Sequence, residues 1–139
     1  MNYIQAIKNF EPINEQEQND KKLILNFIEK NNDVLYRENE YAHMTSSGLI
    51  FNKNLDKILM VHHNIYNTWS WTGGHADGED DLLKVAIKEA KEETGVKDIG
   101  FLDENIIAID ILPVVPHIKR GKFVSGHLHF CISYALVAD

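Results

Sequence analysis

The sequence is poor in cysteine, in basic residues and in long apolar runs, and each shortage excludes a class of protein. Cys131 is the only cysteine, so an internal disulfide and a zinc site built from cysteines alone are excluded. The 14 Lys and Arg residues are outnumbered by 21 Asp and Glu residues, and this argues against binding to a nucleic-acid backbone. Apolar runs reach only about five residues, far below the roughly 20 that cross a bilayer, so we expect no membrane partner.

The remaining composition is that of a globular protein with one domain. The chain has 139 residues, of which 44% are hydrophobic and 25% charged, a balance typical of a single folded unit. We therefore treat 1–139 as one domain. Acidic residues and Asn occur early, and the apolar segment of a secretory signal is not found there. We expect a cytoplasmic location.

Residues 1–40 differ from the rest in being rich in Asn, Gln, Glu and Lys. Asn14 followed by Glu17 resembles a capping box, and an apolar stripe with helical spacing follows it, so a helix is predicted over about 15–30. A shorter helix is expected over about 2–10. We favour a helical layer that packs on a sheet over a lid that covers a substrate.

Beyond Tyr41 the pattern changes to short apolar runs separated by turn residues, which is typical of strands. Strands are predicted at 43–51 and 57–62 around a hairpin loop, before a glycine turn at 73–74, at 99–112 with breaks at Pro113 and Pro116, and at 125–137. A helix is predicted at 80–94, with Gly95 as its C-cap. This order indicates a mixed α/β or α+β sandwich.

The predicted helix at 80–94 carries three acids on one face. Glu89, Glu92 and Glu93 are spaced i, i+3 and i+4, which brings their carboxylates together on a helix. They repel one another, and they stand in the last turns, where the helix dipole disfavours negative charge. Helix stability therefore does not explain the three glutamates. Binding of a hard divalent cation would explain their clustering. The simpler alternative is an acidic helix face exposed to solvent.

The glycine-rich loop before this helix decides between the two interpretations, because loop and helix together resemble the Nudix family. Gly74 opens the family's box, Asp80 takes the position of its first Glu, and Lys88 takes the position of its Arg. The remaining box residues are in register: Glu89, Ala90, Glu92, Glu93, Gly95 and Val96. The loop sequence Gly-Gly-His-Ala-Asp-Gly resembles that of a bacterial branch of the family.

The resemblance implies a Nudix-type α/β/α sandwich with a mixed sheet, here with an N-terminal helical extension and with the box at 74–96. Family members usually continue with a C-terminal helix, which we expect to be lacking here, in a trimmed chain or in a short member. The resemblance is also compatible with a homodimer, since Nudix proteins often form dimers.

The implied function is hydrolysis of a pyrophosphate bond in a nucleoside diphosphate linked to another moiety, with Mg²⁺ or Mn²⁺. By position, Glu89, Glu92 and Glu93 are implied to hold the metal and act in catalysis, with the backbone carbonyl of Gly74 beside them. Glu89 is our preferred residue for activating water, although some family members use a later loop. His75, inside the box loop, is the histidine expected to approach the small-molecule substrate, and Gly74 is expected to contact the substrate as well. We expect no polymeric nucleic acid as partner.

Two departures from the signature favour a rival hypothesis, a non-catalytic Nudix-fold domain that binds a ligand or regulates. Lys88 cannot reproduce the planar contact of the Arg, and Asp80 is one methylene shorter than Glu. The three retained glutamates argue against this rival. A second rival is an isomerase of isopentenyl diphosphate type, which needs a cysteine in the cleft. Cys131 lacks the matching context and is expected to pack as a small apolar residue.

His127 and His129 alternate along the last predicted strand and so share one face of it. With seven histidines in the chain, a zinc or transition-metal site is conceivable. We favour cleft lining or hydrogen bonding within the sheet, because no second ligand pair has a recognisable spacing.

Overall fold

A mixed sheet of five strands organises the molecule, with strand order β2-β1-β9-β6 and with β5 paired to β1. The computed structural model describes residues 1–64 and 67–139. The elements are α1 (Tyr3–Asn9), α2 (Glu15–Lys30), β1 (Ala42–Phe51), β2 (Ile58–Leu59), β3 (Val61–His63), β4 (Thr68–Ser70), β5 (Thr72–His75), α3 (Leu82–Thr94), β6 (Gly100–Val114), β7 (His117–Lys119), β8 (Lys122–Val124) and β9 (His127–Val137). The pairing of β1 with β9 is parallel, and the other pairings are antiparallel.

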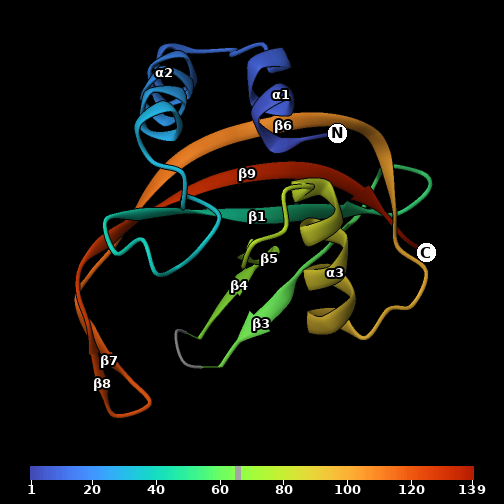
Figure 1. The fold of residues 1–139 in the computed structure, drawn as a ribbon. Coiled ribbons are helices and arrows are strands. Elements are labelled where there is room, and N and C mark those ends of the chain that lie inside the picture. The colour runs from blue at the N-terminus through green and yellow to red at the C-terminus, as the bar shows by residue number, and fades with distance from the viewer. Residues whose placement is uncertain (65–66) are drawn as a thin grey trace.

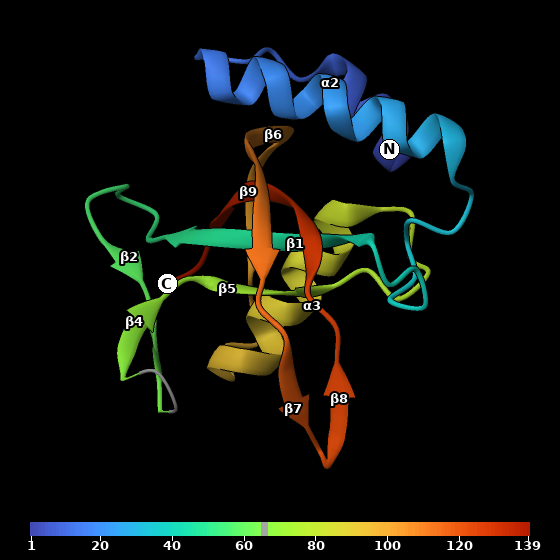
Figure 2. The same ribbon diagram turned by 90° about the vertical axis from the view of Figure 1, so that its left-hand side faces the viewer.

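Helices lie on both sides of this sheet as it is seen in Figure 1, with α1 and α2 beside β6 and α3 beside β1 and β5. Two small ribbons, β3–β4 and β7–β8, extend from the sheet (Figure 2). One apolar core joins all three helices to the sheet. The predicted mixed α/β fold with a helical N-terminal segment is therefore confirmed. Within the residues that the structure describes, no helix is long and apolar enough to cross a membrane.

The N-terminal helices form where the sequence predicts them, and side-chain caps explain their starts. The side chain of Asn14 accepts a hydrogen bond from the Glu17 amide at 2.8 Å. In a reciprocal capping box the Glu would return to the cap residue, but here Glu17 accepts from the Ile13 amide at 3.2 Å. Asn2 caps α1 in the same manner, accepting from the Ile4 amide at 2.8 Å.

Helix α2 protects the outer edge of the sheet. The free edge of β6 carries backbone groups that would otherwise be open to pairing with another chain. Glu17 accepts from the Ile109 amide and Asp20 accepts from the Ile111 amide, both at 3.2 Å. Gln16 donates to the Ile109 carbonyl at 3.1 Å. The N-terminal segment is thus a structural layer, as the sequence indicates, and its polar residues replace a missing neighbouring strand.

Three details of the predicted strands are wrong. Pro113 does not break its strand but lies inside β6, opposite Leu128. A sheet tolerates proline there because β6 is an edge strand. Gly73 and Gly74 do not form a turn but belong to β5, which pairs with β1. The apolar run at 57–62 is divided between β2, which pairs with β1, and β3, which pairs with β4.

Helix α3 starts two residues later than predicted, because Asp81 is its N-cap and accepts from the Lys84 amide at 3.2 Å. Gly95 ends it in the left-handed conformation, at φ 76°, as predicted from its place after the last turn. The buried face packs on the sheet and consists of Leu82, Val85, Ala86 and Ala90.

The first prediction concerns Glu17, whose side chain is only 4% exposed. Replacement by Ala leaves the buried Ile109 amide and the Ile13 amide without their charged acceptor, so Glu17→Ala should lower the free energy of unfolding by about 2 kcal/mol. Urea denaturation measures this loss. Glu29→Ala changes an exposed residue of the same helix and should stay within about 0.5 kcal/mol of the parent. Equal stabilities of the two variants would contradict this account of the edge.

The second prediction concerns Asp110, which faces other acids on the covered edge. Burial, followed by the charges of Glu17 and Asp20, raises the pKa of Asp110. A carboxyl whose pKa is higher in the folded state costs stability once it ionises. Asp110→Asn should therefore raise the melting temperature at pH 7, and the gain should vanish as the pH falls below the usual Asp pKa. A matched control is the exposed Asp98→Asn, which should show neither effect; a gain that persists at acidic pH would refute the assignment.

Candidate active site

The glutamates of α3 meet the sheet at the two glycines of β5. A methyl group added to Gly74 would lie 2.7 Å from both carboxylate oxygens of Glu89, so this carboxylate packs directly on the strand. Glu93 accepts a hydrogen bond from the Gly73 amide at 3.3 Å. Glu92 points to solvent and forms an exposed ion pair with Lys88 at 3.8 Å. The structure thus brings two of the three predicted acids to β5 and leaves the third outside.

The electrostatics of this helix end are those of crowded carboxylates. Burial, and then the charge of Glu92, raises the pKa of Glu89. Burial also raises the pKa of Glu93, while the Gly73 amide opposes that shift. The fold thus disfavours the negative form of both carboxyl groups, and such pKa shifts are concentrated at functional sites.

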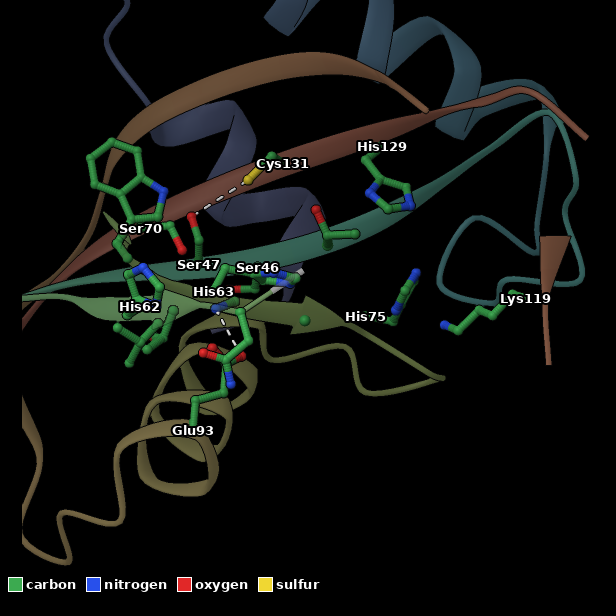
Figure 3. A pocket seen from close by; sticks show the side chains of 17 residues that line it. Ser46, Ser47, His62, His63, Ser70, His75, Glu93, Lys119, His129 and Cys131 are labelled. Atoms are coloured by element: carbon green, nitrogen blue, oxygen red, sulfur yellow. Dashed lines mark hydrogen bonds between the residues drawn. The ribbon is translucent and has the colours of Figure 1, made fainter. Parts of the chain in front are cut away.

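A cleft of about 930 Å³ opens beside these residues (Figure 3). Its walls come from β1, β3, β4, β5, β7 and β9, and Glu93 reaches it from α3. The predicted residues Gly74 and His75 line it, together with Trp71, Lys119 and Cys131. The cleft is large enough for a drug-sized ligand.

Four histidines gather on the cleft face of the sheet, which the sequence spacing did not reveal. In the parallel pair, His43 lies opposite His129, and in the antiparallel pair His75 lies opposite Thr45. Ligand nitrogens of His43, His75 and His129 lie within 4.8 Å of one another. Burial, followed by the charge of Arg37, lowers the pKa of His75 to about 4. Burial, followed by the charge of His75, lowers the pKa of His129 to about 3. These imidazoles are neutral at pH 7.

The box loop is held by a residue outside the box. Arg37 donates twice to Asp77, at 2.9 and 2.6 Å, and this hydrogen bonding lowers the pKa of Asp77. The Gly78 amide donates to the Leu35 carbonyl at 3.0 Å. Lys88, at the position of the signature's Arg, is 67% exposed. The planar contact that Lys88 cannot make is thus replaced, at the loop itself, by the guanidinium of Arg37.

Cys131 is buried, as expected for a small apolar residue, and it also lines the cleft. Its Sγ lies 3.5 Å from the Ser47 hydroxyl, with no carboxylate or imidazole hydrogen bond among the described residues. A nucleophilic cysteine needs such an activating neighbour, so the isomerase alternative gains no support.

The model of the Nudix domain family matches residues 42–128, more than half of the chain. The chain belongs to the Nudix family. The matched region runs from β1 into β9 and includes the Nudix box at 74–96.

Curated relatives match the chain over a short stretch. The m7GpppN-mRNA hydrolase of Saccharomyces cerevisiae is 36% identical over 56 residues, which is 40% of this chain and 6% of that protein. Human nucleoside diphosphate-linked moiety X motif 6 is 36% identical over 53 residues, 37% of this chain and 17% of that protein. The chain therefore spans only a small part of the length of these relatives.

Solved structures match about two thirds of the chain at low sequence identity. A hydrolase of the Nudix family from Clostridium perfringens is 21% identical, with 69% of each chain covered and a TM-score of 0.43. The mutator MutT protein from Bacillus halodurans is 20% identical, with 66% of this chain and 55% of that chain covered and a TM-score of 0.42.

A prediction follows from the contact between Gly74 and Glu89 in the Nudix box. In Gly74→Ala the new methyl must displace the Glu89 carboxylate, which is the flexible end of its side chain, so we expect a loss of stability below about 1 kcal/mol. The carboxyl ¹³C resonance of Glu89 should shift strongly. Gly100→Ala is the matched control, since a methyl there meets only Val137 at 3.9 Å. An unmoved Glu89 resonance in Gly74→Ala would contradict the contact.

Proposed function

We propose that this protein hydrolyses a pyrophosphate bond in a nucleoside diphosphate linked to another moiety, with Mg²⁺ or Mn²⁺ as cofactor. The observation that carries the proposal is the placement of two Nudix glutamates, Glu89 and Glu93, against β5, with Glu93 lining the cleft. The printed names of the human and yeast relatives, a nucleoside diphosphate-linked motif protein and a hydrolase of m7GpppN-mRNA, are consistent with that class of bond.

The residues present fit a hard divalent cation. Glu89, Glu92, Glu93 and the carbonyl of Gly74 offer only oxygen ligands, the type that Mg²⁺ prefers. Glu89 and Glu93 have raised pKa values because of burial and the charge of Glu92, and a cation would relieve both effects. When bound, it would neutralise phosphate oxygens and lower the pKa of a coordinated water. Among the described residues, however, the three carboxylates do not come within 4.8 Å of one another, so the exposed Glu92 would have to turn inward.

The chemical step is an attack of water on one phosphorus atom. The new P–O bond forms as the bond to the bridging oxygen breaks, and the departing phosphate keeps that electron pair. We assign acceptance of the water proton to Glu89, whose raised pKa makes it a better base than a free carboxylate. His75 lines the cleft and is neutral at pH 7, so its remaining N–H can donate to a phosphate oxygen of the substrate.

We further propose a small molecule, not a polymer, as the substrate. The net charge of −7 disfavours tracking a nucleic-acid backbone. A single Nudix domain over 1–139, membership of the bacterial branch, a cytoplasmic location and a homodimer remain predictions of the sequence.

Hydrolysis of a substrate panel tests the function. The panel contains nucleotide sugars, dinucleoside polyphosphates, nucleoside triphosphates and a capped RNA, each with and without Mg²⁺ or Mn²⁺. We expect metal-dependent release of a nucleoside monophosphate from a small substrate. Glu93→Gln and Glu89→Gln should each lower kcat/KM by about 100-fold or more, since even partners outside a metal's coordination shell are worth 10–100-fold.

The matched control is Glu104→Gln, an exposed acid on β6, which should retain parental kcat/KM. Turnover that is independent of metal, or equal in Glu93→Gln and the parent, would refute the proposal. Binding of a panel member without turnover would favour the non-catalytic binding domain, a rival that the exposed position of Lys88 supports. Cleavage of the capped RNA alone would overturn the small-molecule assignment.

A further inference from the structure

The histidine cluster at the cleft is built differently from the carboxylate site. It consists of His43 on β1, His75 on β5 and His129 on β9, with His127 beside them. The ring centroids of the first three lie 5.0 to 5.2 Å apart in every pair. Three separate strands supply these rings, so the cluster is a product of the sheet register and not of one local motif.

His43 points an unpaired nitrogen into this cluster. The residue is 4% exposed, and its Nδ1 lies 3.0 Å from the Asn39 carbonyl. A carbonyl can only accept, so Nδ1 carries the proton and Nε2 carries a lone pair. Within the described residues, this Nε2 is buried without a hydrogen-bond partner. A buried acceptor without a partner is costly, and a cation would satisfy it.

The same reasoning fixes the proton on the neighbouring rings. Nδ1 of His127 lies 2.8 Å from the Ser125 carbonyl, so it donates and leaves Nε2 as an acceptor. Nε2 of His127 lies 3.3 Å from Nε2 of His129, so His129 donates there. Its Nδ1 therefore keeps the lone pair. Imidazoles that bind metals commonly donate their other nitrogen to a carbonyl or another acceptor in this way.

The charges around the cluster permit a cation. Arg37 is the cation that acts on all three rings, but its charge is compensated by the bidentate contact with Asp77. Lys119, at the cleft wall, is exposed to solvent. A divalent ion would thus meet nitrogen donors, with the charge of Arg37 already paired and that of Lys119 exposed to solvent.

We infer that His43, His75 and His129 form a second metal site, specific for an imidazole-preferring divalent cation of the Zn²⁺ class and distinct from the carboxylate site. Zn²⁺, and Co²⁺ as its spectroscopic substitute, accept nitrogen ligands readily, whereas Mg²⁺ prefers oxygen. Three protein ligands leave a fourth position open, as in sites that bind an exchangeable water or ligand. Because His75 and His129 both line the cleft, that position faces the cleft. His127 is a positioning residue, acting through His129.

Cobalt binding tests this inference independently of the proposed hydrolysis. The metal-stripped full chain is titrated with Co²⁺ in excess Mg²⁺, which occupies the carboxylates, and the visible absorption of Co²⁺ is recorded. We expect one equivalent of Co²⁺ with the intense bands of a tetrahedral site. His75→Gln and His129→Asn should each weaken binding by more than about 100-fold, and His127→Asn by 10–100-fold, the range for outer partners.

Two controls separate this site from the rest of the chain. His117→Gln alters a histidine outside the cluster, and Glu93→Gln alters the carboxylate site; both should retain the Co²⁺ bands. Absence of binding in the parent, retention in both His75→Gln and His129→Asn, or loss in Glu93→Gln would overturn the inference. As a check that needs no variant, Zn²⁺ should raise the melting temperature of the parent in excess Mg²⁺, because a ligand that binds only the folded state stabilises it.

Discussion

The parallel pairing of β1 with β9 is the interaction on which the rest of the structure depends. It joins ten consecutive residue pairs, from Ala42 opposite Leu128 to Phe51 opposite Val137. Because strand side chains alternate between faces, this register sends Met44 and Phe130 to the core, and His43 and His129 to the opposite face, where the cleft lies. A slip by one residue would exchange the core with the site. Both the stability of the domain and the chemistry of its cleft therefore rest on one register.

Function and stability oppose each other at the junction of α3 with β5. Glu89 and Glu93 of α3 are held against the backbone of β5, and the raised pKa values of these two residues are the electrostatic sign of that cost. Gly74 allows the approach, because any side chain there would occupy the place of the Glu89 carboxylate. The rest of the fold supports this strain through the apolar face of α3 and through Arg37, which anchors the loop at Asp77. Sites of this kind are commonly less stable than the scaffold around them.

Local signals in the sequence were reliable wherever a structure depends on neighbours along the chain. Asn14 begins α2 and Gly95 ends α3 as expected, because caps act over three or four residues. Predictions failed where pairing partners decide the outcome. Pro113 remains inside β6 because that strand lies at an edge, and Gly74 is in a strand because Ser46 pairs with it. Neither edge position nor partner can be read from the residues themselves.

The sequence by itself determined the family and the order of its acids, since the Nudix box is a continuous stretch whose helical period places three glutamates on one face. It also showed that His127 and His129 share a face, which is a consequence of strand geometry alone. Only the tertiary structure decided that Glu93 reaches the cleft while Glu92 faces solvent, and that His43 and His75 join His129. These contacts link residues far apart in the chain, and they arise from sheet register and helix packing, which no local spacing encodes.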